Sequence, residues 1–511
     1  MHIRPALRVL SWLLLLLSAS MALPLVWSVY DLLISHDKAH QPVLQAFAAT
    51  ILTGLGLSAL LYTISLKSQG QPGRREAMFI VSSAWFLGAA LGAMPYYSWA
   101  FLSGSGTHEF ASYVNCYFES ISGLTTTGAS ILSDIESVPR GLLLWRALSQ
   151  WIGGLGIVVL FVAVMPLLAS TNKRIFQAES SGIGKNQDTP SLQEMARVLW
   201  LIYTGLTILQ TVLLRMADPD LGWFSALSFA FSTAATAGFS IFNQSAGGIS
   251  MLSQWICIIF MFIAGVNYSL YFRLVRGKPG DLFRDIEFRV YFLTLAGATI
   301  ILYLYIQGYP YHDMAGQPAS STTFRAVTDA AFQSVSIQTT TGFSTADSDQ
   351  WPVITHLVLV VLMLIGGCAG STGGGIKVIR FVALFKMIYA EIERVYRPNV
   401  VRPCLVGSGT LTQSQRHSVL IHVFMVFALI AAGGFLLLAI EGPEVMDLST
   451  ALTAATASVN NIGPGFSLVG ATQNYSFLST PSKILLAFLM GVGRLEVFTV
   501  MALFTPRFWR L

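Results

Sequence analysis

Long apolar runs, separated by short polar connections, dominate the chain. A first run extends to Val29, and further runs lie near 43–66, 77–100, 141–169, 193–216, 251–275, 288–307, 353–390, 418–440 and 482–505. About 20 apolar residues are enough for a helix to cross the hydrocarbon core of a bilayer. The pattern therefore predicts ten crossing helices, and the run 353–390 is longer than the others and interrupted by glycines.

The N-terminus also has the features of a signal peptide. Arg4 and Arg8 precede a leucine-rich run, and the residues from Ser18 to Ala22 would pass as a cleavage site. The apolar run is nevertheless about 20 residues long, which is enough to span a bilayer, and many more spans follow it. We therefore expect the first helix to be retained.

Four short polar stretches recur between the apolar runs. They are Leu124–Ser130, Ala235–Ser240, Ser336–Ser344 and Val459–Ser467, and their shared glycines are residues 128, 238, 342 and 463. The glycines follow one another at intervals of about 105 to 120 residues, and such a fixed period indicates an internal repeat. Each stretch follows a helix-like segment of small residues and precedes a long apolar run.

The polarity of these stretches predicts a cation pore. Lipid cannot satisfy backbone polar groups, so each stretch must face water or line a cavity. A re-entrant helix that enters from outside points its partially negative end at the membrane centre, and glycine lets carbonyls turn toward an axis. Four such stretches around one axis would surround a cation with carbonyls, as potassium filters do. The residues expected to bind the ion are Thr126, Thr127, Gly128, Thr236, Ala237, Gly238, Thr340, Thr341, Gly342, Asn461, Ile462 and Gly463.

The predicted fold is an all-α polytopic membrane protein. Four tandem helix–pore-helix–filter–helix repeats surround a pseudo-four-fold pore, and an extra pair of transmembrane helices precedes them. The expected division of the chain is a helix pair in 1–70 and pore repeats in 71–172, 173–280, 281–400 and 401–511. The fourth filter departs from the threonine-rich version, with Asn461, Ile462 and Pro464 around its glycine, and this asymmetry is expected to loosen selectivity.

Composition supports a membrane protein and excludes several classes of function. Hydrophobic residues make up 54% of the 511 residues and charged residues 11%, against about 25% charged in soluble domains. The four cysteines and eight histidines are scattered without metal-ligand spacing. No Ser-His-Asp or paired-carboxylate arrangement is visible, so we expect neither catalysis nor a bound cofactor. The net charge of +5 does not suggest nucleic acid, because the location of charge matters more than its sum in a membrane protein.

The location of charge predicts the orientation. Cations gather in the termini and in alternate connections, for example at Arg4, Arg8, Lys67, Arg74, Arg75, Arg273, Arg276, Lys278, Arg394, Arg397, Arg416 and Arg507. The opposite connections hold few cations, among them Arg146, and many acids, such as Asp134, Glu136, Asp347, Asp349 and Glu441. The positive-inside rule then places both termini in the cytoplasm, and the four polar stretches enter from outside.

Two further features lie within the apolar runs. The glycine-rich segment 366–377 superficially suggests a phosphate-binding loop, but Ile376 separates Gly375 from Lys377 and the segment interrupts a span, so we reject nucleotide binding there. A glycine-rich break under a pore has little side-chain bulk and can block or clear the path; the alternative is a simple helix kink. Arg494 is a charge inside a span, and such residues usually face a cavity or a partner. Glu496 is a poor partner for it at a spacing of two.

Together these motifs resemble the Trk/Ktr/HKT superfamily of potassium transporters and, within it, the membrane subunit of the bacterial Trk system. The resemblance rests on the four polar stretches, on Gln150–Gly156, on Gly366–Arg380 and on Gly493–Thr499 with Leu503–Pro506. It covers essentially the whole chain. The extra helix pair is typical of the Trk subunit and is absent from the shorter Ktr subunit.

The resemblance implies potassium as the transported ion, a bacterial inner membrane, a homodimer in which each protomer has its own pore, and a cytosolic ring of nucleotide-binding regulatory subunits. Superfamily members that favour sodium often carry serine at the first filter glycine, so Gly128 implies preference for potassium. The glycine-rich break corresponds to an intramembrane gating loop, and Arg494 corresponds to an arginine aimed at the permeation path. The gate residues implied are Gly366, Gly367, Gly370, Ser371, Thr372, Gly373, Gly374, Gly375, Lys377 and Arg494.

The alternative function is a secondary carrier that couples potassium to proton or sodium movement, as a symport. Many such carriers use inverted repeats with a site between broken helices. Here each repeat crosses twice, so all four repeats share one orientation, and this favours a pore.

Overall fold

The computed structural model describes residues 3–35, 41–66, 73–169, 192–319, 322–398, 404–407 and 409–509. Lys67 and the expected domain boundaries at 70, 172 and 400 lie outside these residues. The described chain is almost entirely helical and includes one small hairpin of β1 (Leu405–Val406) and β2 (Gly409–Thr410). The prediction of an all-α fold is therefore confirmed.

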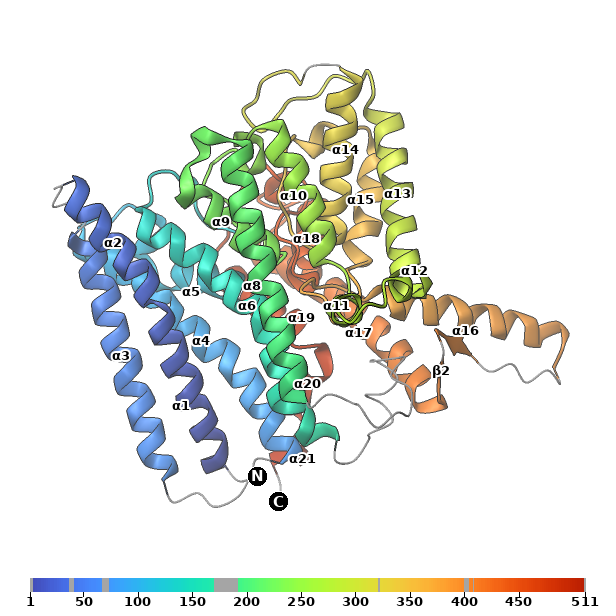
Figure 1. Cartoon of the computed structure of the whole chain (residues 1–511), viewed down its shortest axis with the longest axis horizontal. Helices are drawn as coiled ribbons and strands as arrows, with labels where there is room; N and C mark the ends of the chain where they lie inside the picture. The colour runs from blue at the N-terminus through green and yellow to red at the C-terminus, as the bar shows by residue number, and fades with distance from the viewer. Residues whose placement is uncertain are drawn as a thin grey trace.

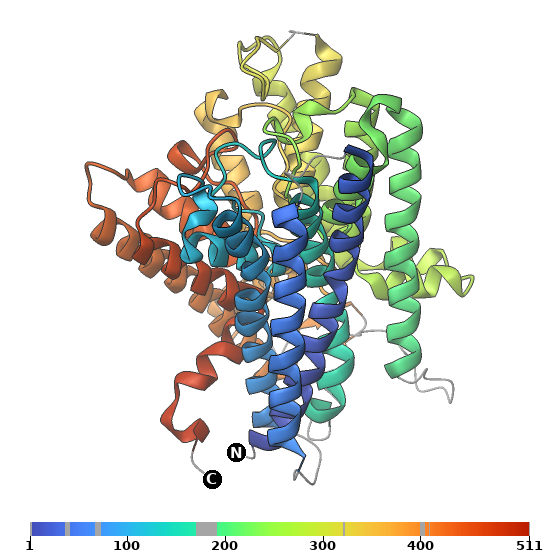
Figure 2. The same cartoon turned by 90° about the vertical axis from the view of Figure 1, so that its left-hand side faces the viewer.

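Two long helices precede the repeats. The first is formed by α1 (Ile3–Ser20) and α2 (Ala22–Ser35), and the second is α3 (Gln41–Ser65). Figures 1 and 2 show α1 and α3 side by side along one flank. They pack closely because Gly54 lies against the Ser18 hydroxyl, where an added Cβ would stand 2.1 Å from Oγ. Small residues allow such close approach between membrane helices.

Each repeat then consists of a long helix, a shorter helix, a loop and a further helical stretch, which is interrupted in repeats 2, 3 and 4. Repeat 1 contains α4 (Arg74–Leu102), α5 (Tyr113–Leu124) and α6 (Arg140–Ala169), and repeat 2 contains α8 (Leu192–Ala217), α9 (Gly222–Ala234), α10 (Met251–Ala264) and α11 (Tyr268–Val275). Repeat 3 contains α13 (Ile286–Ile306), α14 (Thr323–Gln338), α15 (Val353–Leu364) and α16 (Val378–Tyr396). Repeat 4 contains α17 (Gln413–Glu441), α18 (Leu448–Asn460), α19 (Thr480–Arg494) and α20 (Val497–Met501). The connections hold α12 (Gly280–Arg284), α21 (Pro506–Trp509) and short 3-10 turns, among them η5 (Ser348–Gln350) and η6 (Ser467–Val469). This order confirms the four predicted helix–pore-helix–loop–helix units.

Six helices in the described ranges are long and apolar enough to cross a membrane, or up to eight if each bent pair counts as one span. The expected runs 251–275 and 482–505 are helical but broken, with a bend of 92° between α10 and α11 and of 115° between α19 and α20. Asn267 causes the first break by capping α11, since its side chain accepts from the Ser269 amide at 2.9 Å. At the second break Glu496 has φ of 55°, which no α-helix contains.

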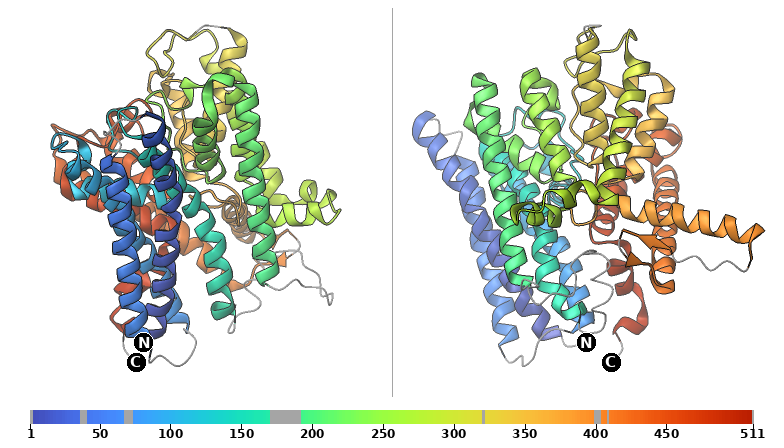
Figure 3. Two further views of the ribbon diagram at one scale, coloured as in Figure 1. Left: turned by 60° about the vertical axis from the view of Figure 1, so that its left-hand side comes forward. Right: turned by 45° about the vertical axis from the view of Figure 1, so that its right-hand side comes forward.

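The short helices α5, α9, α14 and α18 have mostly buried side chains and lie among the long helices (Figure 1). Both chain ends lie at the same end of the molecule (Figure 1), where Arg75 at the start of α4 donates to the Phe508 carbonyl of α21 at 3.4 Å. In contrast, α16 projects sideways from the bundle (Figure 3, right). The interior helices are rich in serine and threonine that are fully buried. Polar side chains at the centre of an apolar bundle indicate where the functional site lies.

Candidate functional site

The four interior helices end in the same way. The second residue after each helix, or the first in the case of α18, has a left-handed φ: 54° at Thr126, 51° at Thr236, 60° at Thr340 and 55° at Asn461. The glycine two positions later is also left-handed, with φ of 84° at Gly128, 79° at Gly238, 84° at Gly342 and 102° at Gly463. We call residues 125–128, 235–238, 339–342 and 460–463 glycine segments 1 to 4.

Local hydrogen bonds explain this shared conformation. In segment 1 the Thr126 amide donates to the Gly123 carbonyl at 3.0 Å and the Thr127 amide donates to the Ser122 carbonyl at 2.8 Å. In the other segments the residue before the glycine likewise donates its amide to the carbonyl five residues earlier. These bonds run from Ala237 to Ser232 at 3.0 Å, from Thr341 to Ser336 at 2.8 Å and from Ile462 to Ala457 at 2.9 Å. This is the helix-ending motif that normally places glycine in the left-handed position. A threonine there costs of order 1–3 kcal/mol, and such strain persists where the surroundings enforce it, typically at functional sites.

The four glycine segments form a closed ring. A Cβ added to Gly128 would lie 2.2 Å from the Ala237 carbonyl oxygen of segment 2. The same close approach recurs around the ring. An added Cβ would lie 2.0 Å from the Thr341 carbonyl oxygen at Gly238, 2.0 Å from that of Ile462 at Gly342 and 2.8 Å from that of Thr127 at Gly463. Only glycine permits this contact together with a positive φ. The structure therefore brings the twelve predicted ion-binding residues together in one ring.

Side chains from neighbouring elements bond the ring together. Asn461 of segment 4 donates from Nδ2 to the Thr127 hydroxyl of segment 1 at 2.9 Å. Gln150 of α6 donates from Nε2 to the Ala237 carbonyl at 2.6 Å and accepts from the Phe239 amide at 3.2 Å. The carbonyl of Ala237 thus already has a hydrogen-bond partner. Sequence reasoning used Gln150 only as part of a motif, since nothing local to it signals a contact 87 residues away.

The glycine-rich loop, residues 366–377, joins α15 to α16 and lies against the ends of the interior helices. Its base is closed by the Gly366 amide, which donates to the Ile376 carbonyl at 3.0 Å. At its centre the Gly374 amide donates to the Thr340 hydroxyl of segment 3 at 2.7 Å. The Thr372 hydroxyl donates to the Ala234 carbonyl at the end of α9 at 3.2 Å. All the predicted gate residues except Arg494 therefore belong to one irregular segment in direct contact with the ring.

Glycines of this loop also allow backbone to approach backbone. A Cβ on Gly374 would stand 2.3 Å from the Asn460 carbonyl of segment 4, and one on Gly373 would stand 3.0 Å from the Thr339 carbonyl of segment 3. At the start of the loop, a Cβ on Gly366 would stand 2.3 Å from the Gly374 carbonyl oxygen. A bulkier residue at Gly374 or Gly366 cannot fit without displacing backbone.

Two cations contact the glycine-rich loop. Arg494, the last residue of α19, is 5% exposed and donates to the Thr372 carbonyl at 2.8 Å and to the Gly153 carbonyl of α6 at 3.1 Å. Lys377 donates from Nζ to the Gly373 carbonyl. Arg494 has no carboxylate partner in the part of the chain that the structure describes. Its charge therefore stands uncompensated beside the loop.

Glu287 anchors the loop, although none of the sequence motifs pointed to it. This residue lies in the first turn of α13 and is 5% exposed. Its Oε1 accepts from the Ala369 amide at 2.7 Å and from the Ile379 amide at 3.0 Å. One carboxylate oxygen thus holds both ends of the segment 369–379. An acid at the edge of an apolar run was the available signal.

Glu496 contacts a different group from Arg494. It accepts from Arg380 Nη2 at 2.9 Å, and Arg380 Nη1 lies 2.9 Å from His422 Nε2. Arg380 is in the first turn of α16, directly after the glycine-rich loop. This cluster therefore joins α16 to α17 and to the bend that follows Arg494.

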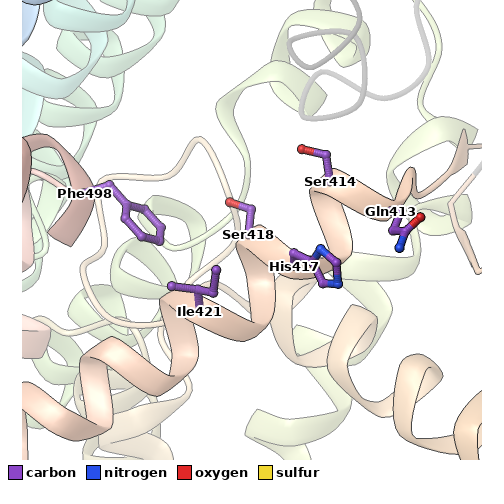
Figure 4. A pocket seen from close by; sticks show the side chains of 6 residues that line it. All are labelled: Gln413, Ser414, His417, Ser418, Ile421 and Phe498. Carbon is purple, nitrogen blue, oxygen red and sulfur yellow. The ribbon is translucent and has the colours of Figure 1, made fainter.

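An open cavity of about 600 Å³ lies between the start of α17 and α20 (Figure 4). It is lined by Gln413, Ser414, His417, Ser418, Ile421 and Phe498. No residue of the glycine segments or of the glycine-rich loop lines it, so it is separate from the ring. Within the described ranges there is no group of three or more side chains able to hold a metal ion, and the four cysteines are buried and free.

Comparisons with known proteins agree along the whole chain. Residues 40–511 match the family model TrkH, described as a cation transport protein. The chain is 35% identical over 518 residues to the Trk system potassium uptake protein TrkH of Escherichia coli K12, with 100% of both chains covered. It is 31% identical over 513 residues to TrkG of the same organism, covering 100% of this chain and 99% of TrkG. The crystal structure of the potassium transporter TrkH from Vibrio parahaemolyticus matches with a TM-score of 0.83 and 30% identity, covering 100% of both chains.

Proposed function

The chain belongs to the TrkH family of cation transport proteins, and from this premise we propose that it takes up potassium through the ring of glycine segments. It is a polytopic membrane transport protein and not an enzyme. Potassium is the transported ion, and the function requires no cofactor. The finer proposal is that the twelve residues of the ring named above form the selectivity filter.

One observation carries this proposal, namely the closed contact of four segments with the same alternation of backbone conformation. Four chemically similar loops around one axis can replace the hydration shell of a cation with backbone carbonyls. The interior helices end at the ring, and their C-terminal ends carry partial negative charge that favours a cation. In segment 2 the Ala237 carbonyl also accepts from Gln150, which fixes its direction and leaves its second lone pair available.

The glycine-rich loop and Arg494 form the proposed gate. The loop contacts the ends of three interior helices, α9, α14 and α18, so it stands in the way of an ion that leaves the ring on that side. The uncompensated charge of Arg494 beside Thr372 adds an electrostatic barrier. The gate opens when the loop gives up its hydrogen bonds to Thr340, Arg494 and Glu287.

The remaining expectations are part of the same proposal. We propose that the protein resides in a bacterial inner membrane with both termini cytoplasmic, that it is a homodimer, and that a cytosolic nucleotide-binding ring regulates it. The position of both chain ends at one end of the molecule (Figure 1) agrees with this orientation. We keep the division into a helix pair, 1–70, and four repeats, 71–172, 173–280, 281–400 and 401–511.

Ion flux tests the proposal directly. Purified protein in liposomes should pass potassium and rubidium in preference to sodium and lithium. The reversal potential, measured with and without a proton gradient, separates a pore from a carrier. A pore gives a potential set by potassium alone, whereas a proton-coupled carrier shifts with pH. Equal sodium and potassium fluxes would refute the filter assignment.

A further inference from the structure

A buried ion pair lies beside segments 1 and 2 of the ring. Glu119 of α5 and Arg146 of α6 have side chains that are 0% and 1% exposed. Arg146 donates from Nε to Glu119 Oε1 at 2.8 Å, and its Nη2 lies 2.7 Å from the same oxygen. The charge pattern predicts Arg146 to be one of the few cations in the outer connections, whereas the structure buries it almost fully. Two charges are removed from water only where the geometry is close and the remaining hydrogen bonds are satisfied.

The pair holds the chain that leaves segment 1. Glu119 accepts from the Ser130 hydroxyl at 2.9 Å and from the Ile131 amide at 3.0 Å. Arg146 Nη2 also donates to the Ser130 hydroxyl at 3.2 Å. Ser130 lies two residues after Gly128, so the pair fixes this segment directly beyond its glycine.

The same arginine crosses into repeat 2. Arg146 Nη1 donates to the Ser240 carbonyl at 3.0 Å, and its guanidinium lies 4.2 Å from the ring centroid of Phe239. Ser240 lies two residues after Gly238, so it corresponds to Ser130 of repeat 1. One guanidinium therefore bridges equivalent positions of adjacent segments.

Gln150 extends this bridge along α6. It follows Arg146 by four residues, so both side chains lie on the same helix face. Gln150 bonds the Ala237 carbonyl and the Phe239 amide, and Arg146 bonds the Ser240 carbonyl. This face of α6 thus contacts segment 2 on both sides of Gly238.

Repeat 3 also has an arginine–carboxylate pair beside its glycine segment, but this pair bonds only to its own repeat. Arg325 of α14 donates from Nε to Asp329 Oδ2 at 2.8 Å and from Nη2 to the Thr345 carbonyl at 3.2 Å. All three residues belong to repeat 3, so this pair fixes one segment without reaching its neighbour. Arg325 is partly buried, with 17% of its side chain exposed. Comparing the two arginines separates the effect of disturbing an ion pair near the ring from the effect of removing a bridge between repeats.

We propose that Arg146, held by Glu119 and aided by Gln150, sets the spacing of segments 1 and 2 and so determines ion discrimination. Arg146 is a positioning residue, since it acts through the backbone of Ser240. The inference rests on the proposed filter function of the ring. Glu119 neutralises the guanidinium, so the bridge fixes distance without adding a charge that repels the ion.

The test is Arg146→Lys, measured as the ratio of potassium to sodium flux in liposomes. Lysine keeps the positive charge beside Glu119, but its ammonium lacks the planar fork that reaches the carboxylate and the Ser240 carbonyl together. We expect the ratio to fall by several-fold, because segment 2 loses the contact that fixes its distance from segment 1. Arg325→Lys should lower the ratio less, and Arg394→Lys on the exposed part of α16 should leave it unchanged.

The outcomes decide between the claims. An unchanged ratio in folded Arg146→Lys protein overturns the inference, and so does an equal fall in Arg325→Lys, which would reveal a general effect of disturbing buried charge. If Arg146→Lys does not fold, Gln150→Met removes the second contact with segment 2 and leaves the ion pair intact, and its ratio must fall. If the unaltered protein itself does not discriminate, the filter proposal fails and not only this inference.

Discussion

The ring of glycine segments and the glycine-rich loop are in contact, yet they are held in different ways. Each glycine segment is fixed by its own interior helix, through amide bonds such as that from Thr127 to Ser122, and by the next segment. The loop is instead fixed by side chains from distant parts of the chain, namely Glu287 and Thr340 of its own repeat and Arg494 of repeat 4. A segment bonded through its backbone to its own helix keeps its conformation when neighbours move, whereas a loop held by distant side chains is released when those side chains move. The difference predicts that ion choice and ion rate can be changed separately.

The largest effect on basal flux is expected from removing the positive charge of Arg494 beside the glycine-rich loop. One positive charge about 5 Å from a monovalent cation repels it by roughly 3 kcal/mol at an effective dielectric near 20, which slows passage by about a hundredfold. Arg494→Ala should therefore raise basal flux by up to about a hundredfold in liposomes. The variant also loses the bond to the Thr372 carbonyl, which acts in the same direction.

Arg494→Lys is the matched control, because it keeps the charge and should retain most of the barrier. Flux is normalised to folded, reconstituted protein. If the alanine and lysine variants both match the parent, Arg494 does not face the ion.

Shortening the loop should have the next largest effect. Removal of Gly373, Gly374 and Gly375 takes away the residues that approach segments 3 and 4. We expect basal flux to rise about tenfold, equivalent to a barrier lowered by about 1.4 kcal/mol, with the order of potassium, rubidium, sodium and lithium unchanged. Unchanged flux in a folded variant would mean that the segment is only a kink, and a changed ion order would break the proposed separation of ring and loop.

A change in the ring should alter the choice of ion more than the rate of transport. Gly128→Ser places a Cβ 2.2 Å from the Ala237 carbonyl at a φ of 84°, so segments 1 and 2 must shift. We expect the potassium to sodium flux ratio to fall by several-fold, while the potassium flux changes less than in the loop variants. Gly104→Ser is the control, because Gly104 also has a positive φ, of 69°, but has open space around it. A similar loss in both variants would point to backbone strain alone.

The smallest effect concerns Asp349 in η5, in the connection between segment 3 and α15. Burial raises the pKa of this carboxyl from 3.8 to about 6, opposed by a hydrogen bond from the Ser467 backbone in η6. The folded protein therefore binds the proton more tightly than the unfolded chain, and the stabilisation is lost as pH rises from about 4 through about 6. We expect a melting temperature a few degrees higher at pH 4.5 than at pH 7 from this group. Asp349→Asn should remove that part of the pH dependence, as measured by thermal unfolding in detergent.

Local patterns predicted much of this molecule. Runs of about 20 apolar residues fix helix positions because bilayer thickness sets their length, and the runs near 43–66, 77–100 and 193–216 agree closely with α3, α4 and α8. The recurrence of glycine at 128, 238, 342 and 463 was visible because each position requires a backbone conformation that other residues resist. Bends were harder to predict, since hydropathy is continuous through the breaks at Asn267 and Glu496.

The sequence by itself determined the helices, their order in four repeats and the glycines of the ring, because hydropathy and backbone conformation are properties of neighbouring residues. Only the tertiary structure decided which groups meet. Arg146 reaches Ser240 across 94 residues, and Arg494 reaches Thr372 across 122 and Gly153 across 341. No local pattern encodes such pairs, because they arise when separately formed helices pack around a common axis and each buried polar group must find a partner there. For the same reason the sequence showed Arg146 as a charge near the outer side, and the fold made it a bridge between two segments of the ring.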